Sequence, residues 1–258
     1  EKERSVGLGV MGFHSYLQQH SIPLESVMSK AWNKKIFKHI QEHVDQASKD
    51  LADERGPCPD AADYGYNERF SNKTAIAPTA SISIICGGAS PGVEPVAANS
   101  YTHKTLSGSF NVKNRYLVEL LEKHGKNTDD VWSGITTNQG SVSHLDFLTD
   151  LEKDVFKTAF ELDQKWIIEL SGDRTPYISQ AQSINLFVPA DIHKRELHKI
   201  HFDAWKKGLK SLYYCRSKSI QRAENVNDTK ATDVNANVYK SKPQTTEQPE
   251  YEECLSCQ

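Results

Sequence analysis

The chain has 258 residues, of which 37% are hydrophobic and 25% are charged, so it can bury the core of one large domain or two small ones. Its net charge of −3 comes from intermixed acids and bases, which argues against a nucleic-acid polymer as a partner. No apolar run approaches the roughly 20 residues of a membrane span, and residues 1–4 are neither a signal nor a transit peptide, so no membrane partner is expected. Five cysteines without a disulfide-framework spacing favour reduced thiols and a cytoplasmic location.

The N-terminal segment contains a glycine pattern, Gly7–Gly12, that matches the dinucleotide-binding sequence G-x-G-x-x-G. That motif requires a buried strand before it and an acid about 20 residues after it in a strand–helix context. The preceding residues, Glu1–Ser5, are charged instead. We therefore expect the glycines to let the start of a helix pack closely against its neighbours.

A long amphipathic helix is predicted from about Glu25 to Glu54, ending at Gly56 and Pro57, because apolar residues recur at steps of three and four. The predicted inward residues are Met28, Trp32, Ile36, Ile40, Val44, Ala47 and Leu51. Residues His39–His43 on this helix match the zinc-protease pattern H-x-x-E-H. They lie beside the apolar stripe and no third ligand is marked out downstream, so a solvated helix flank is the favoured interpretation.

A turn-rich loop is expected over Cys58–Phe70, followed by a short β-prone run, Thr74–Ala77. A strand that turns into a helix just after this run leaves the first helix amides unpaired at the strand tip, which suits an anion such as phosphate. The candidate binding residues are Pro78, Thr79, Ala80, Ser81, Ile82 and Ser83. A capped helix followed by a glycine-rich loop explains the same stretch, Pro78–Pro95, and both interpretations remain open.

Three helices are expected after this loop. The first runs from about Asn114 to Gly125, and the second spans Asp129–Thr137. Thr149 and Glu152 have the spacing of a capping box at the start of the third helix, whose apolar residues continue to Gly172.

The next elements form a strand–helix–strand unit: Ser183–Val188, Asp191–Lys207 and Leu209–Cys215. Together with Thr74–Ala77 this unit predicts an α/β fold with at least three buried strands that alternate with helices. Three histidines lie on the helix of this unit, at His193, His198 and His201. Since no acidic or thiolate partner accompanies them, surface histidines are favoured over a metal site.

Two adjacent tyrosines, Tyr213 and Tyr214, close the last predicted strand, where the residues alone favour core or rim aromatics with rings on opposite faces. From Arg216 onward the composition becomes polar, which predicts a flexible tether. Cys254 and Cys257 near its end form a C-x-x-C motif, which is either half of a zinc site or a redox dithiol. With no second C-x-x-C in the chain, the redox dithiol is favoured.

Four of these segments resemble, in the same order, segments of the large (α) subunit of class I ribonucleotide reductase. They are RSVGLGVMGF at Arg4–Phe13, PTASIS with GVEP in Pro78–Pro95, SLYYC at Ser211–Cys215 and CLSC at Cys254–Cys257. The resemblance covers only the C-terminal part of such a subunit. It implies that residues 1–215 are the C-terminal part of the ten-stranded α/β barrel of that family and that residues 216–258 are a flexible tail ending in the redox C-x-x-C.

The resemblance also implies roles for particular residues. Pro78–Ser83 would bind the phosphates of a ribonucleoside diphosphate. Tyr214 would receive a radical and Tyr213 would pass it inward, with electron and proton leaving each neutral phenol together. Cys254 and Cys257 would re-reduce the active site and be reduced in turn by thioredoxin or glutaredoxin. The radical would come from a metal cofactor in a separate small subunit, so no cofactor is expected in this chain.

The sequence also departs from the family pattern. The catalytic Asn-x-Cys-x-Glu loop and the two cysteines that reduce the ribose are missing, and Cys58, Cys86 and Cys215 lack that context, so no role is predicted for them. The chain begins without methionine inside a matching segment, which indicates a split-gene product, a processed fragment or an artificial boundary. We therefore expect activity only together with the N-terminal part of the same large subunit and the small subunit.

The expected function is thus deoxyribonucleotide production for DNA replication, as part of a thioredoxin-dependent ribonucleoside-diphosphate reductase. One alternative is a free-standing thiol–disulfide carrier, which would be unaffected by a Tyr213→Phe change. The other is a non-catalytic fragment that only completes the fold of another chain. In that case Cys254→Ser with Cys257→Ser would leave the assembled complex active with thioredoxin as reductant.

Overall fold

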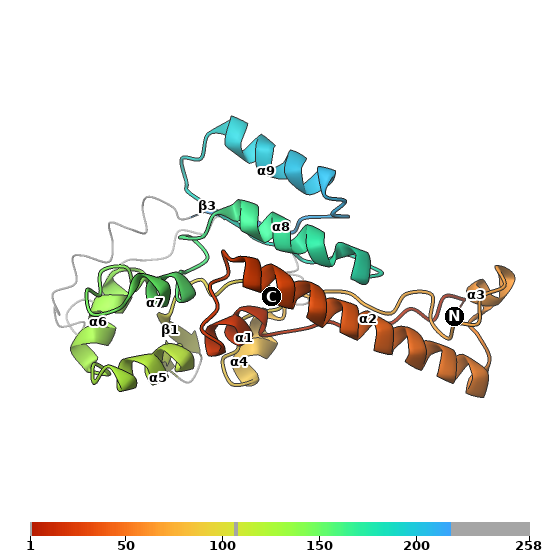
Figure 1. Ribbon diagram of the computed structural model, residues 1–258, viewed down its shortest axis with the longest axis horizontal. Coiled ribbons are helices and arrows are strands. Elements are labelled where there is room, and N and C mark those ends of the chain that lie inside the picture. The colour runs from red at the N-terminus through yellow and green to blue at the C-terminus, as the bar shows by residue number, and fades with distance from the viewer. Residues whose placement is uncertain (1, 106–107, 218–258) are drawn as a thin grey trace, which may run out of the picture. The chain divides into compact units, whose positions relative to one another are not determined.

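The computed structural model describes residues 2–105 and 108–217 (Figure 1). The helices are α1 (Phe13–Gln19), α2 (Val27–Arg55), α3 (Pro59–Asp63), α4 (Ala80–Ile85), α5 (Arg115–Lys123), α6 (Asp129–Thr137), α7 (Asp150–Val155), α8 (Gln164–Arg174), the 3-10 turn η1 (Thr175–Tyr177) and α9 (Lys194–Lys206). The strands are β1 (Ser100–Thr105), β2 (Gly108–Lys113), β3 (Leu186–Val188) and β4 (Cys215–Ser217). The predicted tail, with Cys254 and Cys257, lies outside the described residues except for Arg216 and Ser217, which belong to β4.

Parallel pairing joins four extended segments in chain order. Single bridges pair Leu8 with Thr74 and Ile76 with Gln182, both in parallel. Further along the third segment, β3 pairs in parallel with β4. Each segment therefore lies beside the one that precedes it in the sequence, and the chain between them crosses over through helices. The α/β fold class is confirmed, and it extends to a segment at Leu8 that the sequence did not mark as a strand. The prediction of at least three buried strands was wrong, because Thr74 and Ile76 form only single bridges and β4 is exposed and starts at Cys215.

Glycines near the N-terminus let two of these segments approach each other closely. A Cβ atom on Gly9 would lie 2.6 Å from the carbonyl oxygen of Ala75, closer than side-chain atoms can come. Gly12 precedes α1 with a φ of 83°, in the left-handed region that favours glycine. Close packing at the glycines is confirmed, but the tightest contact joins two extended segments and does not lie at the helix start.

The helix α2 confirms the predicted long helix but turns a different face inward. Its buried residues are Ser29, Asn33, Phe37, Ser48 and Ala52. Met28, which was expected inside, is 57% exposed. The predicted stripe was wrong by about one residue because polar side chains occupy the buried face. Asn33, for example, donates a hydrogen bond to the Leu170 carbonyl at 2.8 Å.

An arginine in α8 joins α2 and α8, which lie side by side (Figure 1). The side chain of Arg174 is fully buried and donates to Gln182 at 2.6 Å, and to Asn33 and Ser171 at 2.9 Å each. Burial lowers the pKa of Arg174 to about 9, so the guanidinium remains charged at neutral pH. This charge is held inside the core by neutral acceptors, which makes it a structural polar network.

The predicted helix from Thr149 to Gly172 is in fact two helices. The capping box at its start is confirmed, because Thr149 accepts from the Glu152 N–H while Glu152 accepts from the Thr149 N–H. Beyond α7, Thr158 donates through its N–H and its hydroxyl to the Glu161 carboxylate, at 2.8 Å each. Such local side-chain bonds compete with helical pairing, so the chain stops and restarts as α8.

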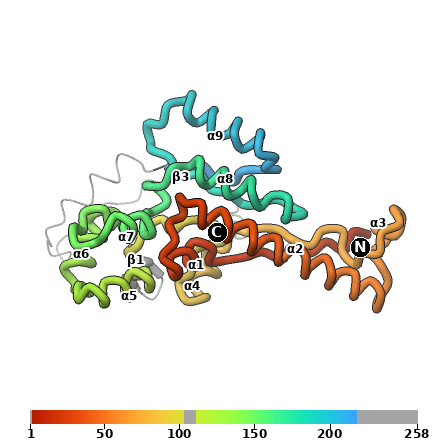
Figure 2. The backbone as a smooth tube through the Cα atoms, in the orientation of Figure 1, coloured from red at the N-terminus to blue at the C-terminus, as the bar shows by residue number. Residues whose placement is uncertain are grey.

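A hydrophobic cluster joins α5, α6 and α7, which Figure 2 shows as neighbours. The cluster includes Leu117, Leu121, Trp132, Ile135 and Val155, all of them buried. The bounds of α6 match the predicted helix, and α5 lies within the predicted range. The antiparallel β1–β2 hairpin that precedes these helices was not predicted.

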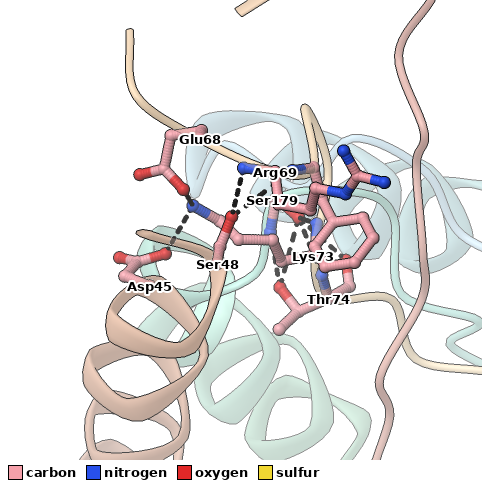
Figure 3. A network of polar contacts seen from close by, with 8 residues as sticks. Asp45, Ser48, Glu68, Arg69, Lys73, Thr74 and Ser179 are labelled. Carbon is pink, nitrogen blue, oxygen red and sulfur yellow. Dashed lines mark hydrogen bonds and ion pairs between the residues drawn. The ribbon is translucent and has the colours of Figure 1, made fainter. Parts of the chain in front are cut away.

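The predicted loop over Cys58–Phe70 was wrong in part, because it contains the helix α3. Just beyond it, Lys73 forms ion pairs with Asp45 of α2 at 2.8 Å and with Glu68 at 3.1 Å (Figure 3). In the same network the Ser179 N–H donates to the Thr74 hydroxyl at 2.9 Å. These contacts fix the start of the segment Thr74–Ile76 between α2 and the chain that follows η1.

No helix within residues 2–105 and 108–217 is long and apolar enough to cross a membrane. In the same described part of the chain, no three metal-binding side chains gather where they could hold an ion. His39 and His43 are exposed on α2, as expected of a solvated flank. His193 caps α9 by accepting a hydrogen bond from the Arg195 N–H at 3.1 Å.

Candidate functional site

The loop after the second extended segment turns into the short helix α4, as the sequence predicted. Thr79 immediately precedes α4, in the left-handed region with a φ of 54°. The Ser83 N–H donates to the Thr79 carbonyl at 2.9 Å, which forms the first turn. Helix geometry leaves the amides of Ala80, Ser81 and Ile82 without a partner inside the helix. These amides are the donors that this loop offers to an anion.

The three hydroxyl groups of the loop have different surroundings. Ser83 is buried, and its hydroxyl donates to the Ala80 carbonyl at 2.9 Å. The Thr79 hydroxyl accepts from the Gly92 N–H at 2.7 Å, which leaves its proton for another acceptor. Ser81 is exposed. The hydroxyls of Thr79 and Ser81 are therefore the ones able to donate to a ligand, whereas that of Ser83 stabilises the helix.

Gly92, near the end of the Pro78–Pro95 stretch, packs against Ala77 and Pro78 at its start. Its φ of 49° lies in the left-handed region. A Cβ atom at this position would lie 2.8 Å from the Ala77 carbonyl oxygen and 3.4 Å from that of Pro78. A larger residue would therefore displace the start of the Pro78–Ser83 loop.

The chain on both sides of Gly92 is fixed on α1. Ser90 and Ser15 exchange hydrogen bonds, with each N–H donating to the hydroxyl of the other at 2.8 and 3.1 Å. The Val96 N–H donates to Nδ1 of His14 at 3.0 Å. Burial lowers the pKa of His14 to about 3, so the ring is neutral at pH 7 and its Nδ1 can accept. Segment 90–96 is thus held at both ends.

The tyrosine pair lies where the chain enters β4. The ring centroids of Tyr213 and Tyr214 are 4.1 Å apart with an angle of 51° between the planes. Their side chains are in contact, although adjacent residues of a regular strand point to opposite faces. The prediction that the pair closes the last strand was wrong, because β4 begins at Cys215. Tyr213 and Tyr214 are 44% and 48% exposed, so a partner can reach both rings.

The tyrosine pair and the Pro78–Ser83 loop both lie just past the bridge between Ile76 and Gln182. Ile76, just before the loop, is opposite Gln182. Further along that same segment, the Tyr213 N–H donates to the Ile184 carbonyl and the Leu186 N–H donates to the Tyr214 carbonyl, both at 2.8 Å. Both features therefore follow this bridge, and the tyrosines lie at the amino end of β4, not beyond its carboxyl end.

Three further polar residues lie between these two features, and the sequence analysis gave them no role: Glu94, Asn185 and Arg216. The Asn185 side chain accepts a hydrogen bond from the Tyr214 N–H at 3.0 Å, and Asn185 is also a polar neighbour of the Glu94 carboxyl. Burial raises the pKa of Glu94, while Asn185 and the charge of Arg216 oppose that rise. One signal was available in the sequence, because Asn185 interrupts a run of buried apolar residues.

The described cysteines stand apart from this arrangement. Cys58 is buried, and its sulfur lies 3.4 Å from the Ser71 hydroxyl. Cys86 follows α4, Cys215 starts β4, and both are exposed. No disulfide joins any of these three, which form no redox pair in the described part of the chain.

Comparison with known proteins gives the class of protein to which this fold belongs. A family model described as the ribonucleotide reductase barrel domain matches residues 1–68 and 60–215. The chain therefore belongs to the ribonucleotide reductase family, and what it shares is the barrel domain. This confirms the resemblance and the fold that the motifs had indicated.

Three relatives show which proteins of this family the chain resembles. Over 230 residues the chain is 50% identical to the ribonucleoside-diphosphate reductase large subunit of Invertebrate iridescent virus 6, covering 88% of this chain and 24% of that protein. It is 38% identical over 256 residues to a putative large subunit of Frog virus 3, covering 99% and 42%. The solved alpha subunit of the Actinobacillus ureae class Id ribonucleotide reductase is similar with a TM-score of 0.79 and 40% identity, covering 86% and 41%. The chain thus spans less than half the length of these relatives.

Proposed function

We propose that this chain works as part of the large subunit of a ribonucleoside-diphosphate reductase, where it binds the substrate diphosphate and conducts the radical. The observation that carries the proposal is the contact of Tyr213 with Tyr214 just past the Ile76–Gln182 bridge, which the Pro78–Ser83 loop also follows. The similar proteins named above are large or alpha subunits of such reductases. Since the sequence lacks the Asn-x-Cys-x-Glu loop of the family, catalysis requires the remaining part of the subunit.

The loop supplies the substrate-binding half of the proposal. A diphosphate carries negative charge and several acceptor oxygens. It therefore suits the amides in the first turn of α4 and the hydroxyls of Thr79 and Ser81. Ala80 has no side chain beyond Cβ and allows a phosphate to come close to the backbone. Pro78 and Ile82 flank these donors, and buried Ser83 fixes the turn.

The tyrosine pair supplies the radical-transfer half. In the proposed step the Tyr214 radical takes a hydrogen atom from the Tyr213 phenol, so Tyr214 becomes neutral tyrosine and Tyr213 becomes the radical. Moving the proton together with the electron avoids a charged intermediate on either tyrosine, which would be costly away from water. Ring contact makes the step direct, and the exposure of Tyr214 leaves it open to the small subunit. We infer that the metal and radical cofactor resides in that small subunit.

The tail supplies reducing equivalents in this proposal. Cys254 and Cys257 lie outside the described residues. As a dithiol they would exchange with the active-site disulfide, become oxidised to a disulfide, and be reduced again by thioredoxin or glutaredoxin. A polar tether after β4 would carry them between the active site and the external reductant. Such an enzyme would work in the cytoplasm, where these reductants keep thiols reduced.

The test is ribonucleoside-diphosphate reduction by this chain mixed with the rest of the large subunit and the small subunit, each omitted in turn. We expect product only in the complete mixture with thioredoxin as the reductant. Turnover by this chain alone would contradict the proposal. Activity that survives both Cys254→Ser and Cys257→Ser with thioredoxin would instead favour a fragment that only completes the fold.

A further inference from the structure

A buried acid between the loop and the tyrosine pair has no part in the function proposed so far. Glu94 is 7% exposed, and its Oε1 has no hydrogen-bond partner among the described residues. A carboxylate taken out of water costs folding free energy unless neighbouring groups compensate its charge. A buried polar atom without a partner therefore calls for a specific explanation.

On one side Glu94 reaches the tyrosines. Asn185 is the polar neighbour whose side chain and backbone lower the pKa of the Glu94 carboxyl, against the rise caused by burial. The same Asn185 side chain accepts from the Tyr214 N–H at 3.0 Å. Arg216, whose guanidinium lies 5.9 Å from the centre of the Tyr214 ring, attracts the carboxylate electrostatically. The backbone of Tyr214 therefore contacts Asn185 and its ring lies near Arg216, and both of these residues interact with the Glu94 carboxyl.

On the other side Glu94 is close in sequence to the anchor of the anion-binding loop. Gly92 donates to the Thr79 hydroxyl at 2.7 Å, and the Glu94 N–H donates to the Pro91 carbonyl at 2.9 Å in a tight turn. The chain beyond Glu94 is held by His14 through the Val96 N–H. A shift of Glu94 would therefore displace this short turn, which contacts Thr79 through the Gly92 N–H.

We propose that Glu94 is a positioning residue that joins the Pro78–Ser83 loop to the Tyr213–Tyr214 pair, acting through Asn185 and the charge of Arg216. This inference rests on the proposed function. It assigns Glu94 no contact with substrate and no step of the chemistry. The orientation of Tyr214 thus depends on an acid in the Pro91–Glu94 turn, which contacts the Pro78–Ser83 loop through Gly92 and Thr79.

The first test is a double-mutant cycle in the assembled reductase with Glu94→Gln and Arg216→Met. Arg216→Met alone leaves the carboxylate without its compensating charge and should lower kcat with a smaller effect on KM. Adding Glu94→Gln removes that charge and should restore kcat by about five-fold or more, a coupling typical of residues in direct interaction. Glu42→Gln, at an exposed acid of α2, is the matched control and should restore nothing.

A second cycle, independent of Arg216, uses Asn185→Asp with Glu94→Gln. The aspartate keeps an acceptor for the Tyr214 N–H but places two carboxylates together, which should lower kcat. Glu94→Gln should again restore it. If Glu94 had only a structural role, the fold-changes in kcat of the single variants would multiply in each double variant. The losses in kcat would also follow the losses in thermal unfolding midpoint. That result would overturn the inference.

Tyr213→Phe in the same assembled enzyme keeps this inference separate from the proposed function. If that change leaves turnover intact, the radical-transfer proposal fails and the inference fails with it. If turnover is lost with Tyr213→Phe, while Glu94→Gln restores neither Arg216→Met nor Asn185→Asp, only the inference about Glu94 is wrong.

Discussion

The two most informative buried charges of this chain, Arg174 and Glu94, differ in how completely their neighbours satisfy them. Arg174 donates to three side-chain acceptors and packs beside aromatic rings of Phe13 and Phe37. Among the described residues, Oε1 of Glu94 has no hydrogen-bond partner, and the polar neighbours of Glu94 are Asn185 and Arg216, which adjoin Tyr214. A satisfied buried charge indicates structure, whereas a partly satisfied one at a site indicates function. Changes at the first should therefore affect stability, and changes at the second should affect activity.

The largest effect on activity is expected at the tyrosine pair. Tyr214→Phe removes the phenol that can lose a proton with its electron, so turnover of the assembled reductase should be lost while the free energy of unfolding changes little. Tyr64→Phe, at a highly exposed tyrosine outside the site, serves as the control. Unchanged turnover in Tyr214→Phe, measured as deoxyribonucleotide formed, would remove the tyrosines from the mechanism.

The largest effect on stability is expected at Arg174. Arg174→Ala leaves Gln182, Asn33 and Ser171 without their buried donor. Since each buried polar group left unsatisfied costs about 1–3 kcal/mol, the free energy of unfolding should fall by about 3–5 kcal/mol. Urea unfolding measures this loss. Arg195→Ala, at an exposed arginine of α9, should change stability by less than about 0.5 kcal/mol. Equal losses in the two variants would show that the Arg174 network does not stabilise the core.

His14 should give the fold a specific dependence on pH. Its pKa is about 3 in the folded chain and near 6.5 when unfolded, so below pH 6.5 the unfolded state binds a proton that the folded state does not. Stability from this residue is full above pH 6.5 and should fall by about 2 kcal/mol by pH 5. His14→Gln keeps an acceptor for the Val96 N–H and should remove this part of the pH dependence. Urea unfolding at several pH values measures this difference. If the free energy of unfolding falls equally with pH in both proteins, the His14 ring is not buried in its neutral form.

A smaller effect is expected at the capping box of α7. Thr149→Ala removes a hydroxyl that caps the helix and should lower the free energy of unfolding by about 1 kcal/mol. The matched variant is Thr128→Ala at the start of α6, where the hydroxyl accepts at 3.5 Å without a reciprocal acid. We expect a smaller loss there. A larger loss at Thr128 would mean that the reciprocal bond adds nothing.

The smallest stability effect should occur at Glu94. Glu94→Gln removes a buried charge that is only partly compensated, so the free energy of unfolding should stay unchanged or rise by about 1 kcal/mol. Thermal unfolding compared with turnover of the same preparation measures both quantities. A loss as large as that of Arg174→Ala would place Glu94 with the structural charges and would remove the contrast between the two regions.

Local signals in the sequence predicted the helix ends and the loop well. The pattern at Thr149 gave the capping box, and the run Pro78–Ser83 gave the turn into α4, because both depend on neighbouring residues. Periodicity failed where buried positions are polar. Asn33 lies on the inward face of α2 because its partners come from α8, which no local pattern of α2 contains.

The site itself was predictable only in part. The tyrosines and the loop carry recognisable motifs, but their shared position depends on parallel pairing between residues far apart in the sequence. The segment at Leu8 was missed because its pairing uses backbone groups and glycines, without the alternation that marks a strand. No role was predicted for Glu94, because its polar neighbours Asn185 and Arg216 are distant in the sequence and approach it only in the folded chain.

The most direct test of the account compares Gly92→Val and Tyr213→Phe in the assembled reductase, with substrate binding and turnover measured on the same samples. Gly92→Val would bring a side chain against the Ala77 carbonyl and displace the loop, so binding of the ribonucleoside diphosphate should weaken. Tyr213→Phe should bind the diphosphate normally and form no product. Normal binding in the first variant together with normal turnover in the second would contradict the account.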